Sequence, residues 1–533
     1  MECGGSIIGW IIGESTPEKS IVIFNSGSPG NMRAGSYIVA SSPEGCILGI
    51  VEKLIAGSRL YPVDVSSPTI VDSIISSLGG YRGEYYLKGS VRWLSRIEDL
   101  ERNRVMAPKY PPIPGTPVAS VDNRVLEAAF SPGDRGWVRI GRLEPSGVEY
   151  KININKLSRH LAILAVTGGG KSNTVCVLAR RLVGERNATI VLFDMHGEYG
   201  DLGLEGKARV WSPAALNPAA ISFPELLKLS RMPPNAINQE RILRWAWGNA
   251  MESYKRGYIR PGEILGLTRQ LIEMLPSFKG RVYGRVKVVD RELDLSKMGF
   301  SEPPRDLDSK QIQGVLNKLD DLEDYYSEVL NYKMPISLRE TIRPGMLTVF
   351  DLSSLDEQGA DAVVSHYLRR ILQERKTWKA AGSGYPTPLI VVIEEAHVLV
   401  PAGDETLAKY WASRVAREGR KFGVGLVLVS QRPKNVDPDV LSQTNNKIIL
   451  RMVEPQDIRY VQAASEELSD DLTSLLPTLN PGEAVVIGSM TRLPALVKID
   501  KCEYRTGGGD VDMVEEWASQ SKTSEEDVIS EVF

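Results

Sequence analysis

The stretch RHLAILAVTGGGKSN, residues 159–173, decides the fold. Residues 161–166 are apolar and predict a short buried strand, and three glycines follow it. Val175, Leu178 and Leu182 then recur on one face of a predicted helix. A Gly-rich turn between a strand and a helix suits a phosphate-binding loop, because its backbone N–H groups can turn inward and the helix N-terminus attracts anions. A plain Gly-rich turn is the alternative interpretation.

The side chains of this turn fit the binding of ATP with Mg²⁺. The glycines at 168–170 allow close approach to phosphate oxygens, Lys171 can reach the β and γ phosphates, and the Ser172 hydroxyl can ligate the metal. Ala165 stands where such loops usually begin with glycine. That position turns the chain and does not touch phosphate, so the departure leaves the prediction intact.

Two adjacent carboxylates follow another apolar strand. Residues 389–393 read LIVVI, and Glu394 and Glu395 come directly after them. Paired carboxylates at a sheet end are costly unless a cation balances them. We therefore expect Glu394 to hold the metal through its water shell and Glu395 to orient or deprotonate the attacking water. A solvated acidic turn is the alternative, and His397 fits a structural hydrogen bond at least as well as a catalytic role.

Gln431 comes directly after the next strand, VGLVLVS, and we expect it to sense the γ-phosphate. Phosphoryl transfer also needs positive charge, which such enzymes often take from an adjacent subunit. The helix ending SRVAREGRKFG carries four cations, and Arg420 is the candidate because it lies nearest the helix end. A solvated basic face is the alternative.

Asp194 and Glu198, in FDMHGEY, end a further strand and could serve the metal, the water or a subunit contact.

Composition predicts a soluble globular chain of two to four packed units. The chain has 533 residues, 42% hydrophobic and 25% charged, with a net charge of -3. This charge does not exclude nucleic-acid binding, because a ring or groove can concentrate cations on one surface. The four cysteines lack metal-ligand spacing, and we expect them to be reduced, with no disulfide needed. No apolar stretch approaches membrane-spanning length, so a cytoplasmic location is expected.

The pattern along the chain divides it into five parts. The fold class is α/β, a RecA-like P-loop ATPase core with a mainly parallel sheet, because its strands are almost continuously apolar and alternate with helices. Turn residues break the N-terminal runs into short strands that suit a small barrel. The expected parts are an N-terminal β-barrel at 1–105, a Pro-rich linker at 106–120, the ATPase core at 121–212 and 344–502, a helical insertion at 213–343 and a C-terminal arm at 503–533.

Together these motifs resemble the HerA family of archaeal DNA translocases, within the HerA/FtsK group. The segments that carry the resemblance are RHLAILAVTGGGKSN, FDMHGEY, VVIEEAH, REGRKFGVGLVLVSQRP and LPTLNPGEAVVIG. They span most of the chain, and their number and order make a chance match improbable. Ala165 and Gly169 depart from the family's usual Gly and Ser without endangering ATP binding.

The resemblance implies a homohexameric ring that threads double-stranded DNA and works with a NurA-type nuclease in double-strand break end resection. It implies catalytic roles for Lys171, Glu394, Glu395, Arg420 and Gln431, and metal binding by Ser172 and Glu394. The nucleotide-binding residues that it implies are Arg159, Gly168, Gly169, Gly170, Lys171, Ser172, Asn173, Lys498 and Ile499. DNA should meet Lys and Arg on channel loops, with residues 255–260 and Lys434 as candidates.

Two rival functions remain at this point. An FtsK-like or conjugation-type DNA pump shares the core but normally carries membrane segments or a DNA-reading module. A non-catalytic ring would bind ATP only to assemble and to recruit a nuclease. The intact set of Lys171, Glu395 and Gln431 favours turnover over the scaffold.

Overall fold

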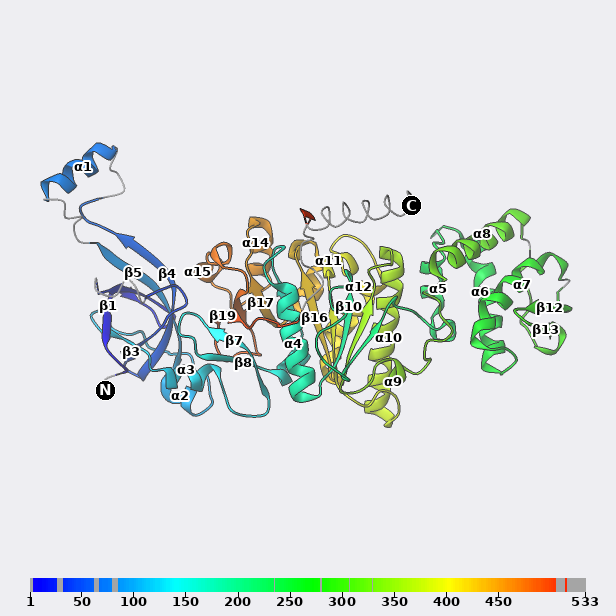
Figure 1. Ribbon diagram of the computed structural model, residues 1–533, viewed down its shortest axis with the longest axis horizontal. Helices are drawn as coiled ribbons and strands as arrows, with labels where there is room; N and C mark the ends of the chain where they lie inside the picture. The colour runs from blue at the N-terminus through cyan, green and yellow to red at the C-terminus, as the bar shows by residue number, and fades with distance from the viewer. Residues whose placement is uncertain are drawn as a thin grey trace, which may run out of the picture.

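The computed structural model describes residues 3–25, 32–61, 67–78, 85–233, 235–278, 280–305, 307–327, 329–504 and 513–514. Three bodies follow one another along the longest axis: a barrel, a large sheet flanked by helices, and a group of helices (Figure 1). This confirms the expected fold class of an α/β core with a small N-terminal β-barrel and a helical insertion. The expected C-terminal arm lies almost entirely outside the described residues.

Six strands close the barrel in the order β1-β2-β5-β4-β3-β6. Their bounds are β1 (Ile7–Ser15), β2 (Lys19–Phe24), β3 (Tyr37–Ser42), β4 (Gly45–Gly57), β5 (Tyr86–Arg96) and β6 (Pro117–Ser120). The last strand corrects the sequence analysis, because β6 falls in the segment expected to be a linker. It pairs with both β1 and β3 and so completes the barrel. Pro117 is tolerated because it stands first in the strand, where a missing N–H costs little.

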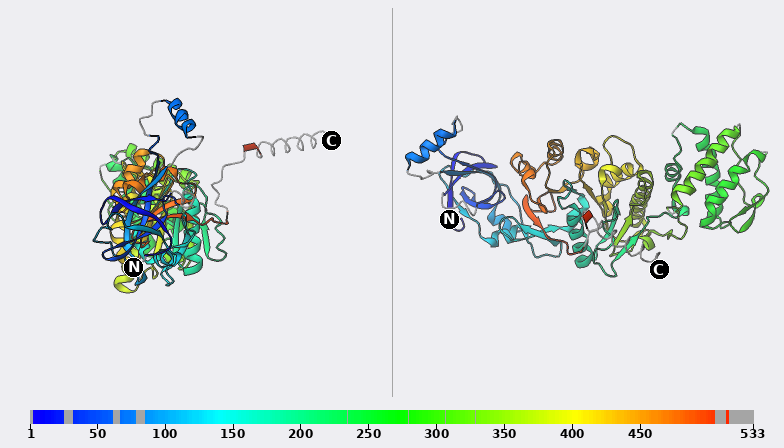
Figure 2. Two further views of the ribbon diagram at one scale, coloured as in Figure 1. Left: turned by 90° about the vertical axis from the view of Figure 1, so that its left-hand side faces the viewer. Right: turned by 45° about the horizontal axis from the view of Figure 1, so that its top comes forward.

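An arm that the sequence analysis did not foresee rises from the barrel. The connection between β4 and β5 carries α1 (Pro68–Ser77), which begins at Ser67, whose hydroxyl caps the helix by accepting from Thr69 N. None of the residues of α1 is buried. The end-on view shows this helix standing away from the rest of the molecule (Figure 2). Two short helices, α2 (Ile97–Glu101) and α3 (Asn123–Phe130), pack together beside the barrel.

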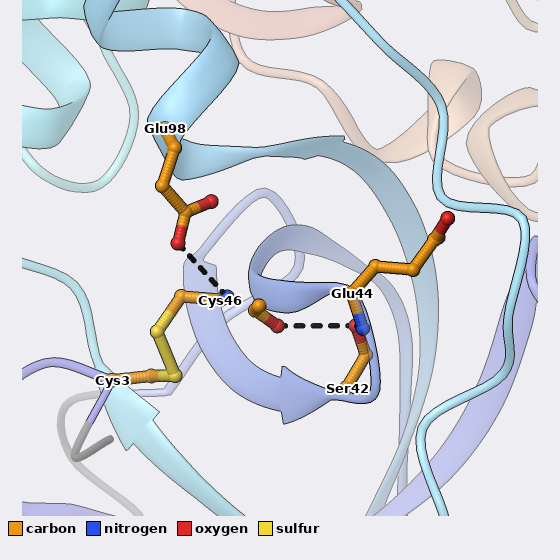
Figure 3. The surroundings of a disulfide bond; sticks show 6 residues. Cys3, Ser42, Glu44, Cys46 and Glu98 are labelled. Atoms are coloured by element: carbon orange, nitrogen blue, oxygen red, sulfur yellow. Dashed lines mark hydrogen bonds between the residues drawn. A yellow bond between two sulfur atoms is a disulfide. The ribbon is translucent and has the colours of Figure 1, made fainter.

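Both cysteine pairs are joined as disulfides, which makes the expectation of unpaired cysteines wrong. Cys3 and Cys46 connect the N-terminal segment to β4, and the Glu98 carboxylate accepts a hydrogen bond from Cys46 N there (Figure 3). Cys176 is joined to Cys502, 326 residues further along the chain. Such proximity comes from the tertiary fold, so spacing in the sequence did not reveal it.

The central sheet has eleven strands in the order β11-β14-β10-β15-β16-β9-β17-β18-β19-β7-β8. It runs parallel from β11 to β17 and antiparallel from β17 to β8. Its strands are β7 (Trp137–Leu143), β8 (Glu149–Asn153), β9 (Leu161–Leu164), β10 (Thr189–Asp194), β11 (Ala208–Trp211), β14 (Leu347–Asp351), β15 (Leu389–Ile393), β16 (Val424–Ser430), β17 (Asn446–Leu450), β18 (Glu483–Ile487) and β19 (Ala495–Ile499).

Both faces of the parallel strands are covered, which explains their continuous apolar sequences. In β10, Val191 and Phe193 join the core shared with α10 and α12, whereas Ile190 and Leu192 join the core shared with α4. The helices of this body are α4 (Lys171–Arg186), α10 (Glu357–Ala381), α11 (Ala396–Leu399), α12 (Leu407–Phe422), α13 (Pro438–Ser442), α14 (Pro455–Ala463) and α15 (Asp470–Thr473). This two-sided packing fixes the sheet edge at which the strands end.

The insertion leaves the sheet after β11 and returns before β14. Its helices are α5 (Phe223–Leu229), α6 (Ile237–Lys255), α7 (Ile264–Glu273), α8 (Ser309–Tyr326) and α9 (Leu338–Thr341). It also holds a hairpin of β12 (Arg285–Val288) and β13 (Arg291–Asp294), which the expected helical insertion did not include. Among the described residues, no helix combines the length and apolarity that crossing a bilayer requires.

Candidate active site

The carboxyl ends of the parallel strands bring the chemistry of the sequence motifs to one edge of the sheet. Phe193 pairs with Ile393 in neighbouring strands, so the residues that follow them, Asp194 and Glu394, lie side by side. β16 lies between β15 and β9, and its last residue, Ser430, pairs with Leu164 just before the Gly-rich turn. Side chains from distant parts of the chain therefore surround the N-terminus of α4.

The Gly-rich turn between β9 and α4 is fixed by its own backbone. Gly169 N donates to Val166 O at 3.0 Å, and Gly169 O accepts from Gly482 N at 3.2 Å. A Cβ at residue 169 would meet the Cβ of Ala165 at 2.9 Å, and Gly170 has a φ of 104°, so both positions need glycine. The first N–H groups of α4 have no acceptor within the helix, which leaves them for an anion.

The end of β19 lies against this turn. Ile499 N donates to Gly482 O at 2.9 Å, and Lys498 Nζ donates to Pro481 O at 2.6 Å. Asn173, in the first turn of α4, uses its amide group to donate to Asp500 O and to accept from Cys502 N. The structure therefore brings Lys498 and Ile499 next to the phosphate-binding loop, whereas Asn173 is engaged in holding the two segments together.

Glu394 and Glu395 are both buried at the end of β15, with 3% and 6% of their surface exposed. Glu394 Oε1 accepts from the Tyr199 hydroxyl at 2.8 Å, and Oε2 is buried without a hydrogen-bond partner among the described residues. Glu395 has a φ of 45°, in the left-handed region that residues other than glycine rarely adopt. A strained backbone and an unpartnered buried oxygen are features that a bound ligand would explain.

The two carboxylates differ in how readily they ionise. Burial, with a further contribution from Asp194, raises the pKa of Glu394 well above its usual range. Burial also acts against ionisation of Glu395, but a hydrogen bond from His397 and the charge of Lys171 outweigh it and lower its pKa. A divalent cation beside Glu394 would supply the positive charge that its ionised form lacks here. Glu394 therefore fits a position beside a metal ion, and Glu395 fits the role of an ionised base.

These oxygens suit Mg²⁺ better than a metal held by protein side chains alone. In the described part of the chain, no group of three or more His, Cys, Asp or Glu side chains is arranged to hold a metal. Mg²⁺ usually keeps several waters and takes one or two protein oxygens plus phosphate oxygens. The Ser172 hydroxyl and Glu394 Oε2 are the protein oxygens that fit this pattern.

A tight turn after β10 contacts three groups of the site. Asp194 and Glu198 of this turn were expected to serve the metal, the water or a subunit contact, without a choice among the three. Glu198 Oε2 accepts from the Ser172 hydroxyl at 2.6 Å, and the Tyr199 hydroxyl bonds Glu394. His196 Nε2 lies 3.7 Å from Glu395 Oε1. The motif FDMHGEY at a strand end was the available signal, but only the fold shows which groups it meets.

Gln431 lies beside the phosphate-binding loop, as its place at the end of β16 suggested. Its Oε1 accepts from the Thr167 hydroxyl at 2.7 Å. His397 Nδ1 lies 3.1 Å from Glu395 Oε2 and 3.4 Å from the Ser430 hydroxyl. His397, in α11, therefore lies between Glu395 and Ser430 of β16 and contacts both, in keeping with a structural role.

Arg159 and Arg420 lie at the other edge of the sheet. Arg159 ends the short helix η1 (Ile154–Arg159) just before β9 begins, and Arg420 stands in the last turn of α12 just before β16 begins. The two helices contact each other. Arg420 is exposed, and Arg159 is partly exposed. Neither is brought to the phosphate-binding loop of its own chain.

The two DNA-contact candidates lie on different bodies. Residues 255–260 end α6 and continue into the loop after it, within the helical insertion, and most of them are exposed. Lys434 belongs to the short helix η6 (Pro433–Asn435), near the end of β16, and its Nζ donates to Gln456 Oε1 at 3.1 Å. The structure does not bring them together into one patch.

Residues 138–371 match the family model described as "Helicase HerA, central domain". Two proteins named DNA double-strand break repair helicase HerA, from Sulfurisphaera tokodaii and Sulfolobus acidocaldarius, are each 39% identical to this chain, with 98% of both chains covered. A protein of the same name from Pyrococcus furiosus is 31% identical, over 93% of this chain and 94% of its own. Among solved structures, VirB4 of Thermoanaerobacter pseudethanolicus aligns with a TM-score of 0.49 and 15% identity, covering 70% of this chain and 98% of that one.

Proposed function

The chain belongs to the HerA helicase family, and from that membership we propose that it hydrolyses ATP to drive movement along double-stranded DNA in double-strand break repair. The observation that carries the proposal is the meeting of a phosphate-binding loop with two buried carboxylates at one sheet edge. Lys171 begins the helix after β9 and Glu394 directly follows β15, and one strand, β16, lies between β9 and β15 in the sheet. That spacing places the carboxylates across from the loop, where the terminal phosphate of a nucleotide would lie.

Each group of the site has a distinct task in this reaction. The loop amides and Lys171 grip the phosphates, and Lys498 and Ile499 border the nucleotide from β19. Glu395, whose pKa is lowered, accepts the proton of the attacking water, and Gln431 orients that water or the γ-phosphate. Mg²⁺, when bound by Ser172 and Glu394, neutralises charge that develops on the phosphate oxygens.

Arg159 and Arg420 support a ring. Both stand at the sheet edge opposite their own phosphate-binding loop, so they can reach a nucleotide only in a neighbouring copy of the chain. A head-to-tail contact of this kind generates a ring when the rotation between neighbouring copies closes. We place Arg420 as the cation that completes the neighbour's site, and Arg159 as a second contact with the neighbour's nucleotide. The proposed assembly is a homohexamer.

Double-stranded DNA is the proposed substrate, held through phosphate contacts without base reading. Residues 255–260 and Lys434 are the proposed contacts, although they lie on separate bodies. A NurA-type nuclease is the proposed partner, and the cytoplasm the proposed location. We propose that the barrel reaches residue 120, followed by the core at 121–212 and 344–502 with the insertion at 213–343.

Replacement of the proposed base tests this function. Glu395→Gln should retain ATP binding and lose roughly 10²-fold or more in hydrolysis, because an amide cannot accept the proton. Glu405→Gln is the matched control, since Glu405 is exposed and lies outside the site. Hydrolysis by purified protein with duplex DNA and Mg²⁺ is the measurement. Unchanged turnover in Glu395→Gln would remove the catalytic assignment and favour a ring that binds ATP only to assemble.

A further inference from the structure

The turn formed by residues 194–199 is built around one buried carboxylate. Asp194 is 1% exposed and accepts hydrogen bonds from the backbone amides of His196, Glu198 and Tyr199. Gly197, with a φ of 71°, lets the chain reverse, and a Cβ there would meet Ser353 Oγ at 3.3 Å. The backbone beneath Glu198 is therefore fixed by the fold, and so is the region that its side chain can reach.

The Glu198 carboxylate accepts a hydrogen bond from the Ser172 hydroxyl. The donor and acceptor oxygens are 2.6 Å apart, which is a short O–H···O hydrogen bond. The other carboxylate of the site, Glu394, is engaged elsewhere, since its Oε1 accepts from Tyr199 and its Oε2 is free for another partner. Glu198, in the turn after β10, thus binds the Ser172 hydroxyl, whereas Glu394, just after β15, keeps an oxygen for the cation.

A serine hydroxyl has one proton to donate and two lone pairs to offer. A metal ligand must present a lone pair, so its proton has to point elsewhere. The bond to Glu198 directs the proton of Ser172 away from the cation site and leaves the lone pairs available. Groups that orient a metal ligand in this way typically contribute about 10- to 100-fold to metal affinity.

We propose that Glu198 is a positioning residue for the divalent cation that accompanies the nucleotide, acting through the hydroxyl of Ser172. The proposal rests on the proposed function, because it assigns a task within the same site. Glu198 neither touches the reacting phosphate nor receives the proton of the water. Its contribution is to the affinity for Mg²⁺ and not to the grip on the nucleotide itself.

The test measures binding of a fluorescent ATP analogue to full-length protein, first in EDTA and then across a titration of Mg²⁺. Glu198→Ala should bind the analogue in EDTA as the unaltered protein does, and should need about 10- to 100-fold more Mg²⁺ for its tighter binding. Glu198→Gln keeps a hydrogen-bond acceptor, so the Mg²⁺ concentration that it needs should fall between those of the unaltered protein and Glu198→Ala. Glu205→Gln is the control, because Glu205 is exposed and lies a few residues away. This variant should need the same Mg²⁺ concentration as the unaltered protein.

A double substitution separates positioning from a general effect on the turn. Ser172→Ala removes the hydroxyl through which Glu198 acts. Adding Glu198→Ala to it should therefore not raise the required Mg²⁺ concentration any further. Additive losses, or equal weakening of binding with and without Mg²⁺, would overturn the proposal. If Glu198→Ala does not fold, Glu198→Gln supplies the same comparison, and an unchanged Mg²⁺ requirement in it would also overturn the proposal. If the unaltered protein binds no nucleotide, the proposed function fails, whereas normal binding with an unaffected Glu198→Ala sinks this inference alone.

Discussion

Arg420→Ala should abolish most hydrolysis without disturbing the fold or the binding of nucleotide. Arg420 is exposed at the end of α12, and truncation there should change stability by about 0.5 kcal/mol or less. β16 separates Arg420 from Gln431 by seven strand residues, which is roughly 20 Å at about 3.3 Å per residue. The guanidinium therefore cannot reach its own site. A cation supplied by a neighbour contributes about 10³-fold or more to turnover.

Mixing two inactive variants tests this geometry directly. Lys171→Ala inactivates a subunit's own site but leaves its Arg420 intact, and Arg420→Ala does the reverse. In randomly assembled rings of equal parts, about a quarter of the interfaces would join an intact loop to an intact arginine. The mixture should therefore recover roughly a quarter of the normal rate, measured by phosphate release with duplex DNA.

The control for the mixing assay is mass measurement, which should show the same assembly for both variants and the mixture. No recovery above the separate variants, although mixed rings form, would refute the placement of Arg420 in a neighbour's site. Full hydrolysis by Arg420→Ala alone would refute its role altogether.

Two further predictions concern the loop contact and a buried charge in the insertion. Gln431→Ala, which also frees the Thr167 hydroxyl, should retain nucleotide binding but slow single-turnover hydrolysis by about 100-fold, and an unchanged rate would contradict the role of Gln431. Burial of Glu225 raises its pKa, but His366 and the permanently charged Arg369 outweigh burial and lower it from 4.5 to about 2. Because the folded pKa is depressed, Glu225 should stabilise the fold above pH 4.5 and lose this stabilisation as the pH falls toward 2. Urea unfolding should therefore show the stability gap between the unaltered protein and Glu225→Gln shrinking in acid, and a constant gap would contradict the assignment.

The placement of the main site groups could be predicted because it needs only strand patterns and chain direction. Apolar runs before the Gly-rich turn, before Glu394 and before Gln431 indicated buried parallel strands, and parallel strands end at a common edge. The structure brings all three to that edge. Their roles remain proposals that the substitutions above would test.

Other features depend on tertiary geometry that leaves no local signal. The bond between Ser172 and Glu198 arises because Asp194 folds the turn back toward α4. The sequence also grouped Arg159 with Lys498 around one nucleotide, whereas the structure places them at opposite sheet edges. Chain direction contained the signal for this separation, because Arg159 precedes β9 whereas the phosphate-binding loop follows it.

The cysteine pairs and the closing barrel strand were missed because they leave no local signal. Cys176 and Cys502 are brought together only when the segment that follows β19 lies against α4. Pro117–Ser120 is a short strand after a Pro-rich stretch, and its partners lie near the start of the chain. Pairing between distant segments is set by the whole fold and not by local composition.

The route of the insertion has a practical consequence for protein engineering. β11 and β14 are adjacent and run in the same direction, yet the insertion is the chain that joins them. After Trp211, the last residue of β11, the backbone must return to the opposite end of the sheet before β14 can start at Leu347. A trimmed motor that lacks these helices would still require a return path of about a dozen residues, because a two-residue reverse turn joins only strands of opposite direction. The insertion can thus be replaced only by a segment that makes the same crossover from the end of β11 to the start of β14.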